Sequence, residues 1–303
     1  MQSSNTLPNG VTGKLSTAAL LELLKPITWF PPMWAFLCGA VSVGADLINN
    51  VGLLIAGIAL TGPLVCGASQ IVNDWYDREV DAINEPNRPI PSGRVPGKIG
   101  FYYALVWSML GLMWGATFGP WVFAATFCGL LLAWAYSAPP FRFKTNGWIG
   151  NAAVGISYEG LAWITGAALM LEGQIPPSPV IFVALLYSLG AHGIMTLNDF
   201  KSIDGDRQMG VRSLPAQLGA DNAAKVACVV MLAPQLVVLS LLMHWQSNWQ
   251  SIAVLLLIGM QLLAMRHMLA APKERAPWYN GTGVTAYVTG MMIAATALPG
   301  AYL

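Results

Sequence analysis

Three aspartates lie close together in the most strongly charged part of the chain, the stretch from residue 73 to residue 94. Asp74, Asp77 and Asp81 are spaced i, i+3 and i+7, so a helix would place them on one face. Carboxylate oxygens are hard ligands that suit Mg²⁺, which proteins bind through a few carboxylates together with substrate phosphates. The spacing therefore predicts a magnesium site. The simpler alternative is a solvated charged loop with an Asp74–Arg78 surface ion pair.

A loop with two arginines follows these aspartates. Pro86 should end the helix, because proline lacks an amide donor and clashes with the preceding turn. The next residues, NRPIPSGR, carry Arg88 and Arg94 on a segment rich in proline and glycine. Guanidinium groups match the geometry of phosphate oxygens, so we predict that both arginines bind a diphosphate.

A second acidic cluster, NDFKSIDGDR, begins with the same Asn–Asp pair as the first. Asp199 and Asp206 would share one face of a continuous helix, whereas Asp204 lies off that face unless the helix ends early at Gly205. Both aspartates, Asp199 and Asp204, therefore remain candidate partners of Asp206. The recurrence predicts a second metal-binding cluster opposite the first, with a chance repeat as the alternative.

Four further basic residues complete the predicted diphosphate site. Arg142 and Lys144 lie two residues apart in the segment YSAPPFRFK, on the same side of an extended turn. Lys201 and Arg207 lie within the second acidic cluster. Cytoplasmic loops of membrane proteins commonly carry basic residues, so this prediction depends on the two acidic clusters beside them.

Two ionisable residues lie inside long apolar runs. Glu159 is in the middle of VGISYEGLAW, and His192 precedes Asp199 by seven residues, which is two helical turns. Charge at hydrocarbon depth is costly and marks a candidate site. The alternatives are a neutral His192 bonded between helices, and a Glu159 that is protonated or paired with Tyr or Trp donors. With Tyr136 and Asn198, these residues form the predicted substrate pocket.

The composition is that of a polytopic membrane protein. Hydrophobic residues make up 55% of the chain and charged residues 10%, and 12 tryptophans are present; the mean hydropathy is +0.57. Each apolar run is near the length that a bilayer requires. The runs lie near residues 27–45, 51–72, 98–117, 119–137, 149–171, 178–198, 223–243, 250–269 and 282–301.

This pattern predicts an all-α fold, a bundle of nine transmembrane helices around a central cavity open to the cytoplasmic side. Residues 16–303 should form a single domain after a mobile tail, residues 1–15. The four cysteines match neither a zinc spacing nor a disulfide framework. No apolar core in the tail resembles a signal peptide.

The basic residues test this topology. With nine spans, all 15 Lys and Arg fall on one side of the membrane or at its span ends. The positive-inside rule makes that side cytoplasmic, with the N-terminus inside and the C-terminus on the opposite side. A net charge of +1 without a basic tract gives no indication of a nucleic-acid partner.

Acidic clusters and basic loops at one membrane face favour an enzyme that handles a diphosphate whose tail lies in the bilayer. Mg²⁺ and basic side chains would neutralise the leaving diphosphate while an acceptor oxygen attacks the allylic carbon. A transporter, the alternative class, would place its charges along the membrane midplane. A pigment-binding structural protein would need His ligands, and the three His residues form no pattern.

The motifs NDxxDxxxD and NRPxPSGR resemble the signature of the UbiA superfamily of intramembrane prenyltransferases. The longer forms NDWYDREVDAINEPNRPIPSGR, YSAPPFRFK and NDFKSIDGDRQMGVRSLP are similar to those of its chlorophyll and bacteriochlorophyll synthase branch. The resemblance covers nearly the whole chain. It implies an Mg²⁺-dependent enzyme that esterifies the propionate of (bacterio)chlorophyllide with geranylgeranyl or phytyl from its diphosphate. A haem, quinone or tocopherol-pathway prenyltransferase is the alternative within the superfamily.

The resemblance also implies a ligand set. Asn73 and the three aspartates that follow it match the family's first Mg²⁺–diphosphate motif, and Asp206 matches the last Asp of the second, DxxxD. Ser202 stands where that second motif has its first Asp, so Asp199 or Asp204 must supply the missing carboxylate. The predicted catalytic residues are Asp74, Asp77, Asp81, Asp199 and Asp206, and Asn73 and Asp204 join them as predicted metal ligands.

The short N-terminal tail lacks a transit-like extension, which favours a bacterial enzyme in an inner or intracytoplasmic membrane. Its expected partners are the two substrates, membrane lipid, and pigment-pathway or membrane-insertion proteins.

Overall fold

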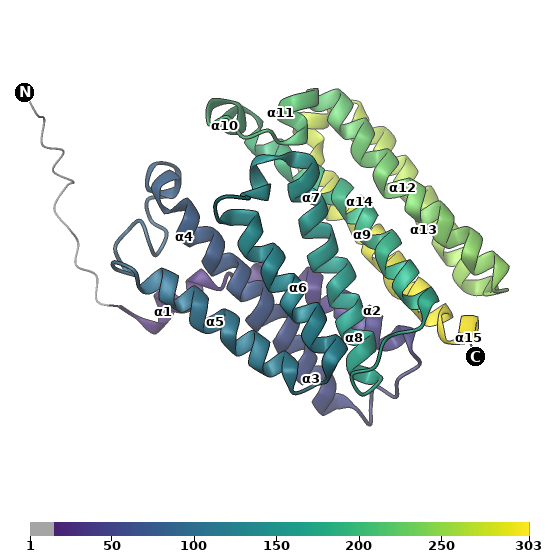
Figure 1. Cartoon of the computed structure of the whole chain (residues 1–303). Coiled ribbons are helices and arrows are strands. Elements are labelled where there is room, and N and C mark those ends of the chain that lie inside the picture. The colour runs from purple at the N-terminus through teal and green to yellow at the C-terminus, as the bar shows by residue number, and fades with distance from the viewer. Residues whose placement is uncertain (1–14, 303) are drawn as a thin grey trace, which may run out of the picture.

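The computed structural model describes residues 15–302, and every regular element among them is a helix (Figure 1). The prediction of an all-α fold is therefore confirmed. The predicted tail, residues 1–15, lies outside the described residues except for Leu15. Asn146 and Arg212 form an isolated bridge that ties together two loops at one end of the bundle.

The first half of the chain supplies the helices that carry the first acidic cluster. A short helix, α1, and a 3₁₀ turn, η1, precede the first long helices. The elements are α1 (Thr17–Leu23), η1 (Pro26–Thr28), α2 (Phe30–Ser42), α3 (Val51–Ala59), η2 (Leu60–Cys66), α4 (Gly67–Asn84), α5 (Ile99–Ala116) and α6 (Pro120–Ser137).

The second half begins with a short turn and ends in a pair of long helices. Its elements are η3 (Phe143–Thr145), α7 (Gly147–Gly155), η4 (Ile156–Leu161), α8 (Ala162–Met170), α9 (Ser178–Asn198), η5 (Asp199–Ser202), α10 (Ile203–Gln208), α11 (Leu214–Leu218), α12 (Ala220–His244), α13 (Asn248–Leu269), α14 (Pro272–Ala297) and α15 (Pro299–Tyr302).

Six stretches of helix in the described part of the chain are long and apolar enough to cross a membrane. The predicted count of nine is not confirmed. The other three predicted runs are helical, but α2 has only 13 residues. The run near residues 149–171 is divided among α7, η4 and α8, and α14 has a polar first half.

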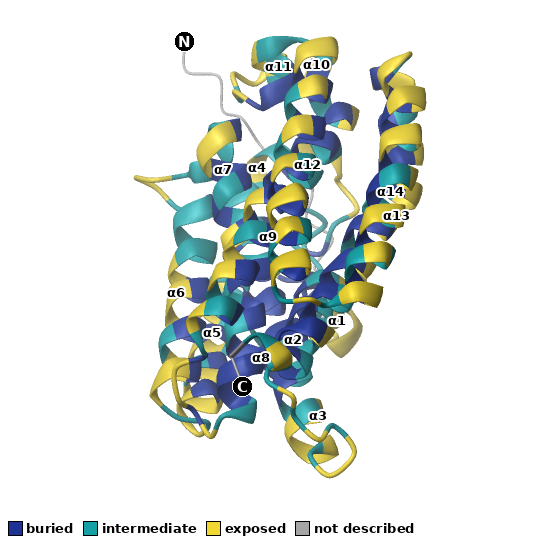
Figure 2. Ribbon diagram, turned by 90° about the vertical axis from the view of Figure 1, so that its right-hand side faces the viewer, coloured by how far each residue is buried: buried dark blue, intermediate teal, exposed yellow. Residues whose placement is uncertain are grey.

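The helices pack as neighbours around a common interior. α4 contacts α5 and α6, α2 contacts α8, and α9 lies between α7 and α12, while α13 pairs with α14. Figure 2 shows buried residues on the inward faces of these helices and exposed residues on the outward faces. Many exposed residues are large and apolar, such as Leu255, Leu263 and Phe127. An apolar outer surface of this kind suits contact with lipid.

Two of the long helices contain a widened π-helical turn. η2 joins α3 to α4 and contains Pro63, and η4 joins α7 to α8. Proline removes one backbone hydrogen bond from a helix, and a π-turn is one way in which a helix absorbs such a change. Residues of both turns line the interior cavity described below.

Glycine allows α2 and α8 to approach closely. A Cβ atom added at Gly166 would lie 2.0 Å from the carbonyl oxygen of Phe36, and one added at Gly39 would lie 1.9 Å from that of Trp163. Both contacts are with backbone, which cannot move aside as a flexible side chain can. Small residues at such crossings are characteristic of membrane helix packing.

We expect Gly166→Ala to destabilise the protein by about 1–3 kcal/mol or more, because overpacking forces the two helices apart. Gly259→Ala is the matched control, since a Cβ at Gly259 in α13 meets nothing within 4 Å. The apparent midpoint of thermal unfolding in detergent measures both variants. Equal midpoints for the two would show that the α2–α8 crossing does not require glycine.

Candidate functional site

The first acidic cluster lies on α4, and each of its aspartates faces a cation. Asp74 is 1% exposed. Its Oδ1 lies 2.5 Å from the Nζ of Lys25 and 3.5 Å from an Nη of Arg88. Arg88 also donates to Oδ2 of Asp81 at 2.8 Å. Arg88 therefore bridges two carboxylates that lie two helical turns apart.

Burial alone would lower the pKa of Arg88, but the carboxylates of Asp74 and Asp81 outweigh it and raise that pKa. The guanidinium group is thus charged at any physiological pH. It neutralises charge on α4. Part of the guanidinium group remains accessible to a ligand, since the Arg88 side chain is 32% exposed.

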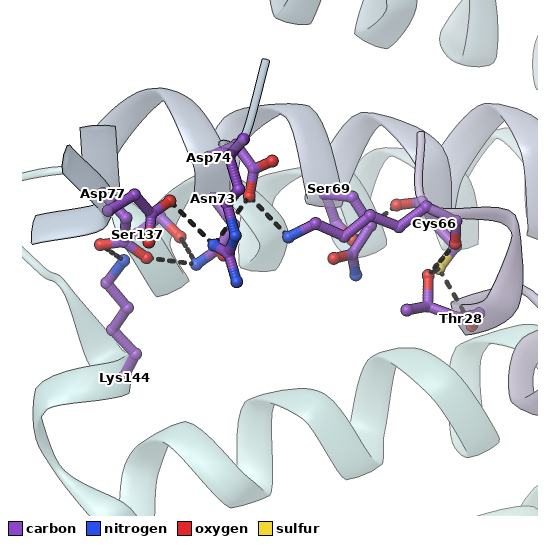
Figure 3. Close-up of polar contacts among 12 residues, drawn as sticks. Thr28, Cys66, Ser69, Asn73, Asp74, Asp77, Ser137 and Lys144 are labelled. Carbon is purple, nitrogen blue, oxygen red and sulfur yellow. Dashed lines mark hydrogen bonds and ion pairs between the residues drawn. The ribbon is translucent and has the colours of Figure 1, made fainter. Parts of the chain in front are cut away.

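Asp77 is held from the opposite side by Lys144, whose Nζ donates to Asp77 Oδ1. Asn73 donates to the other oxygen of Asp77 at 3.0 Å and lies 3.3 Å from the hydroxyl of Ser137. Figure 3 shows Asp77, Asn73 and Asp74 in a row along α4, with Lys144 approaching from a neighbouring segment. Burial lowers the pKa of Lys144, and the carboxylate of Asp77 opposes that shift.

Two basic residues of the site have left-handed backbone conformations. Lys25, between α1 and η1, has φ of 43°, and Arg142, before η3, has φ of 42°. Such angles are uncommon for residues other than glycine and tend to occur at functional sites. The Nε of Arg142 is buried without a hydrogen-bond partner among residues 15–302. A diphosphate oxygen is the kind of acceptor that this donor lacks.

Arg94 is engaged away from these aspartates. It forms two bonds with the carboxylate of Glu22 in α1, of 2.6 and 3.0 Å, and donates to the carbonyl oxygen of Asn87 at 2.5 Å. Its hydrogen bond and charge lower the pKa of Glu22. The pair attaches the arginine-containing loop to α1, so Arg94 positions that loop in this structure, and its predicted contact with diphosphate stays a prediction.

The second cluster does not lie on one continuous α-helix. α9 ends at Asn198, a 3₁₀ turn (η5) follows, and α10 begins at Ile203. The change of helix type therefore comes before Gly205, which lies inside α10. The Ser202 hydroxyl donates to the carbonyl oxygen of Asp199 at 3.1 Å. Serine side chains that bond backbone carbonyls in this way compete with regular helix.

This geometry separates the three aspartates of the second cluster. The Asp204 side chain is 69% exposed and pairs with Lys273 at 3.0 Å. Asp206 accepts hydrogen bonds from Ser202 at 3.0 Å and from Ser213 at 2.6 Å. Asp199 lies 3.5 Å from the amide of Asn151. Ser202 thus orients the carboxylate of Asp206.

The two clusters face a shared space. Tyr136, at the end of α6, lies within electrostatic range of Asp77 in the first cluster and of Asp199 and Asp206 in the second. No ion pair is formed by Asp199 or Asp206 within the described residues. One wall is therefore neutralised by protein cations, whereas the other carries uncompensated carboxylates.

A cavity of about 430 Å³ opens beside these walls. Most of its lining is apolar, and its polar residues include Asn73 and Asn198, the residues directly before Asp74 and Asp199. Tyr136 and Glu159 also line it, and their predicted contact with a substrate stays a prediction. Its volume is that of a small-molecule site.

His192 is not among the described residues that line this cavity. Its Nε2 lies 3.2 Å from the carbonyl oxygen of Trp148, and its ring packs beside that indole at 5.6 Å. The arrangement matches the alternative interpretation of His192, a histidine bonded between helices. Lys201 and Arg207 are exposed, and Arg207 donates to the carbonyl oxygen of Ala216 at 3.5 Å.

Sequence reasoning missed Lys25 as a site residue. It precedes the first apolar run as a lone lysine, and its 49-residue separation from Asp74 left no local pattern to reveal the contact. The sequence feature that could have pointed to Lys25 is the dipeptide Lys25–Pro26, which directly precedes an apolar run.

The donor atoms of the site fit a divalent cation. Asp74 Oδ2 is buried without a hydrogen-bond partner in the described chain, which is costly for a carboxylate oxygen. Aspartate and asparagine oxygens are ligands that Mg²⁺ prefers. Among the described residues, no three or more His, Cys, Asp or Glu side chains lie close enough together to hold a metal ion. Lysines occupy the positions next to Asp74 and Asp77 instead.

Comparison with known proteins agrees with this geometry. Residues 27–297 match the UbiA prenyltransferase family. The chain belongs to this family. It is therefore an integral membrane protein, and its six apolar helices agree with that conclusion.

The chain is similar over nearly its whole length to curated members of the family. It is 55% identical over 282 residues to the bacteriochlorophyll synthase 33 kDa chain of Cereibacter sphaeroides, covering 93% of each chain. It is 54% identical over 284 residues to the protein of the same name from Rhodobacter capsulatus, again covering 93% of each. The chloroplastic chlorophyll synthase of Avena sativa is 38% identical over 287 residues, covering 91% of this chain and 75% of that protein.

Solved structures share the fold. A digeranylgeranylglyceryl phosphate synthase has a TM-score of 0.71 at 21% identity, covering 94% of this chain and 99% of its own. A UbiA homologue from Archaeoglobus fulgidus bound to GPP and Mg²⁺ has a TM-score of 0.63 at 18% identity, covering 94% of this chain and 98% of its own.

We expect Asp199→Asn and Asp206→Asn each to weaken divalent-cation binding by at least about tenfold, because each removes a carboxylate that forms no ion pair among the described residues. Asp204→Asn is the matched control, since Asp204 is exposed beside Lys273. Titration with Mn²⁺ followed by electron paramagnetic resonance, in the presence of a prenyl diphosphate, measures the affinity. Loss of affinity in the Asp204 variant alone would contradict the assignment.

Proposed function

We propose that this protein esterifies the propionate of a (bacterio)chlorophyllide with a geranylgeranyl or phytyl group taken from its diphosphate. Family membership supports the prenyl transfer. Two proteins named bacteriochlorophyll synthase support the tetrapyrrole acceptor, because they are 54–55% identical to this chain over 93% of its length. The more distant similarity to chlorophyll synthases points to the same kind of acceptor.

The observation that carries the proposal is the pairing of two polar walls with an apolar cavity. Lys25, Arg88 and Lys144 pair with carboxylates of α4 that lie on one face of the helix within two turns. Arg142 adds an Nε donor that has no partner within residues 15–302. The apolar cavity that begins at Asn73 offers room for hydrocarbon next to these charges. A prenyl diphosphate has this same division into a charged head and an apolar tail.

The reaction breaks the bond between the allylic carbon and the diphosphate oxygen, and the electron pair leaves with the diphosphate. A propionate oxygen forms the new bond to that carbon, which gives the ester and free diphosphate. Basic side chains stabilise the charge that accumulates on the leaving oxygen. The propionate is already ionised at neutral pH, so the acceptor needs no strong general base.

Mg²⁺ is the proposed cofactor, held by Asp74 and Asp77 with Asn73 on one wall and by Asp199 and Asp206 on the other. When bound, it supplies positive charge that neutralises the diphosphate. Lys25 and Lys144 form ion pairs with Asp74 and Asp77 of this set. We expect these two lysines to bind the diphosphate oxygens when Mg²⁺ binds the carboxylates.

We also propose that the site faces the cytoplasm, across a bacterial inner or intracytoplasmic membrane. The placement of the Lys and Arg residues supports this orientation. Membrane lipid would surround the apolar outer surface.

The purified protein should convert bacteriochlorophyllide and radiolabelled geranylgeranyl or phytyl diphosphate into the esterified pigment, and EDTA should stop the reaction. Pigment extraction and chromatography measure the ester. Turnover with a quinone or haem acceptor but no chlorophyllide would assign the protein to another branch of the family. Uptake of the diphosphate into vesicles without ester formation would support a transporter.

Asp77→Asn should lower kcat by on the order of a thousandfold, because it removes charge stabilisation worth several kcal/mol. The carboxamide is close in shape to the carboxylate, so the fold should persist. Glu79→Gln is the control, since the Glu79 side chain is 86% exposed on the same helix. Activity near that of the wild type in the Asp77 variant at saturating Mg²⁺ would overturn the metal assignment.

A further inference from the structure

The cavity has a second polar region, separate from the acidic clusters. Gln70, Tyr158 and Glu159 line it, together with Ser69 and Cys66. Gln70 precedes Asp77 by seven residues on α4, which corresponds to about 10 Å along the helix axis. Figure 3 shows the same order along α4, with Asp77 at one end of the row and Cys66 with Thr28 at the other.

Most of this inner polar region is hydrogen-bonded. The Tyr158 hydroxyl accepts from the amide of Gln70 at 3.0 Å and lies 3.4 Å from both the Ser69 hydroxyl and the Cys66 sulfur. Thr165, which also lines the cavity, donates to the carbonyl oxygen of Leu161 at 2.7 Å. These groups have partners within the protein and do not need a ligand.

Glu159 is the exception. It is 8% exposed, lines the cavity from the π-helical turn η4, and its Oε2 is buried without a hydrogen-bond partner among the described residues. Within that part of the chain it forms no ion pair. The Tyr287 hydroxyl, which lies within electrostatic range, donates to the carbonyl oxygen of Tyr187. An isolated carboxylate in such surroundings is costly, so the neutral acid, which carries an O–H donor, is favoured.

A prenyl tail cannot satisfy this group. The tail is hydrocarbon, and placing an unpaired polar group against hydrocarbon is unfavourable. The acceptor pigment, by contrast, carries carbonyl groups at its ring edge and has its propionate at another edge. With the propionate near Asp77 and Asp199, the macrocycle would enter the cavity beside the prenyl tail and bring its peripheral carbonyl groups towards Glu159, which lines the same cavity.

We propose that Glu159 is a specificity-determining residue that donates a hydrogen bond to a peripheral carbonyl of the acceptor pigment, the acetyl group of bacteriochlorophyllide a. This inference rests on the proposed function, because it assumes a tetrapyrrole acceptor in the cavity. Glu159 selects the acceptor and takes no part in the bond-making step at the diphosphate.

The test compares bacteriochlorophyllide a with the analogue in which vinyl replaces the acetyl group. Wild type should prefer the acetyl acceptor by about tenfold in kcat/KM, as expected for one buried hydrogen bond. Glu159→Leu and Glu159→Met should lose this preference through a higher KM for the acetyl acceptor. Their KM for the vinyl acceptor and for the prenyl diphosphate should stay unchanged. Glu159→Gln should retain most of the preference, because its amide is also a donor.

Thr165→Val is the matched control, since its hydroxyl already donates to the protein backbone. If Glu159→Leu or Glu159→Met does not fold, the other of these two variants is enough to decide the test. The inference is overturned if wild type does not distinguish the two acceptors, or if the apolar variants keep the preference. A change in KM for the prenyl diphosphate alone would also overturn it. Failure of the wild type to esterify either pigment would refute the proposed function instead.

Discussion

Charge compensation on α4 is the constraint on which the site depends. Three aspartates on one face of a helix inside a membrane protein repel one another unless cations lie between them. Lys25, Arg88 and Lys144 meet this need from three different segments, and so they attach the start of the chain and two loops to α4.

The second wall is built differently. Hydroxyl and amide groups, rather than lysines or arginines, hold Asp199 and Asp206. The space between the walls therefore has a neutralised side and an acidic side. A divalent cation brought in with a diphosphate would balance the acidic side, while the cations on α4 would be shared with the phosphate oxygens. The apolar cavity lies directly beside this space, an arrangement that suits a molecule with a charged head group and a hydrocarbon tail.

Helical periodicity predicted part of this arrangement and could not predict the rest. It correctly placed Asp74, Asp77 and Asp81 on one helix, because an uninterrupted α-helix keeps its register over two turns. It left open whether one continuous helix follows Asp199, and that alternative is wrong, because the 3₁₀ turn η5 separates α9 from α10; the Ser202 hydroxyl bonds a backbone carbonyl in this turn. Hydropathy likewise located all the helical runs, yet only six meet the length and composition of a span in the described chain.

The sequence by itself determined the class of protein, the all-α fold, the two acidic clusters and the family, because composition and short motifs are local properties. The tertiary structure decided which cation meets which carboxylate. Lys25 is 49 residues from Asp74 and Lys144 is 67 residues from Asp77, so no local sequence pattern indicates these contacts. The structure also showed that Arg94 pairs with Glu22 and that His192 packs between helices. Glu159 lines the cavity, and its Oε2 has no hydrogen-bond partner among the described residues. Each of these facts depends on how distant helices pack, which a pattern within a few turns cannot contain.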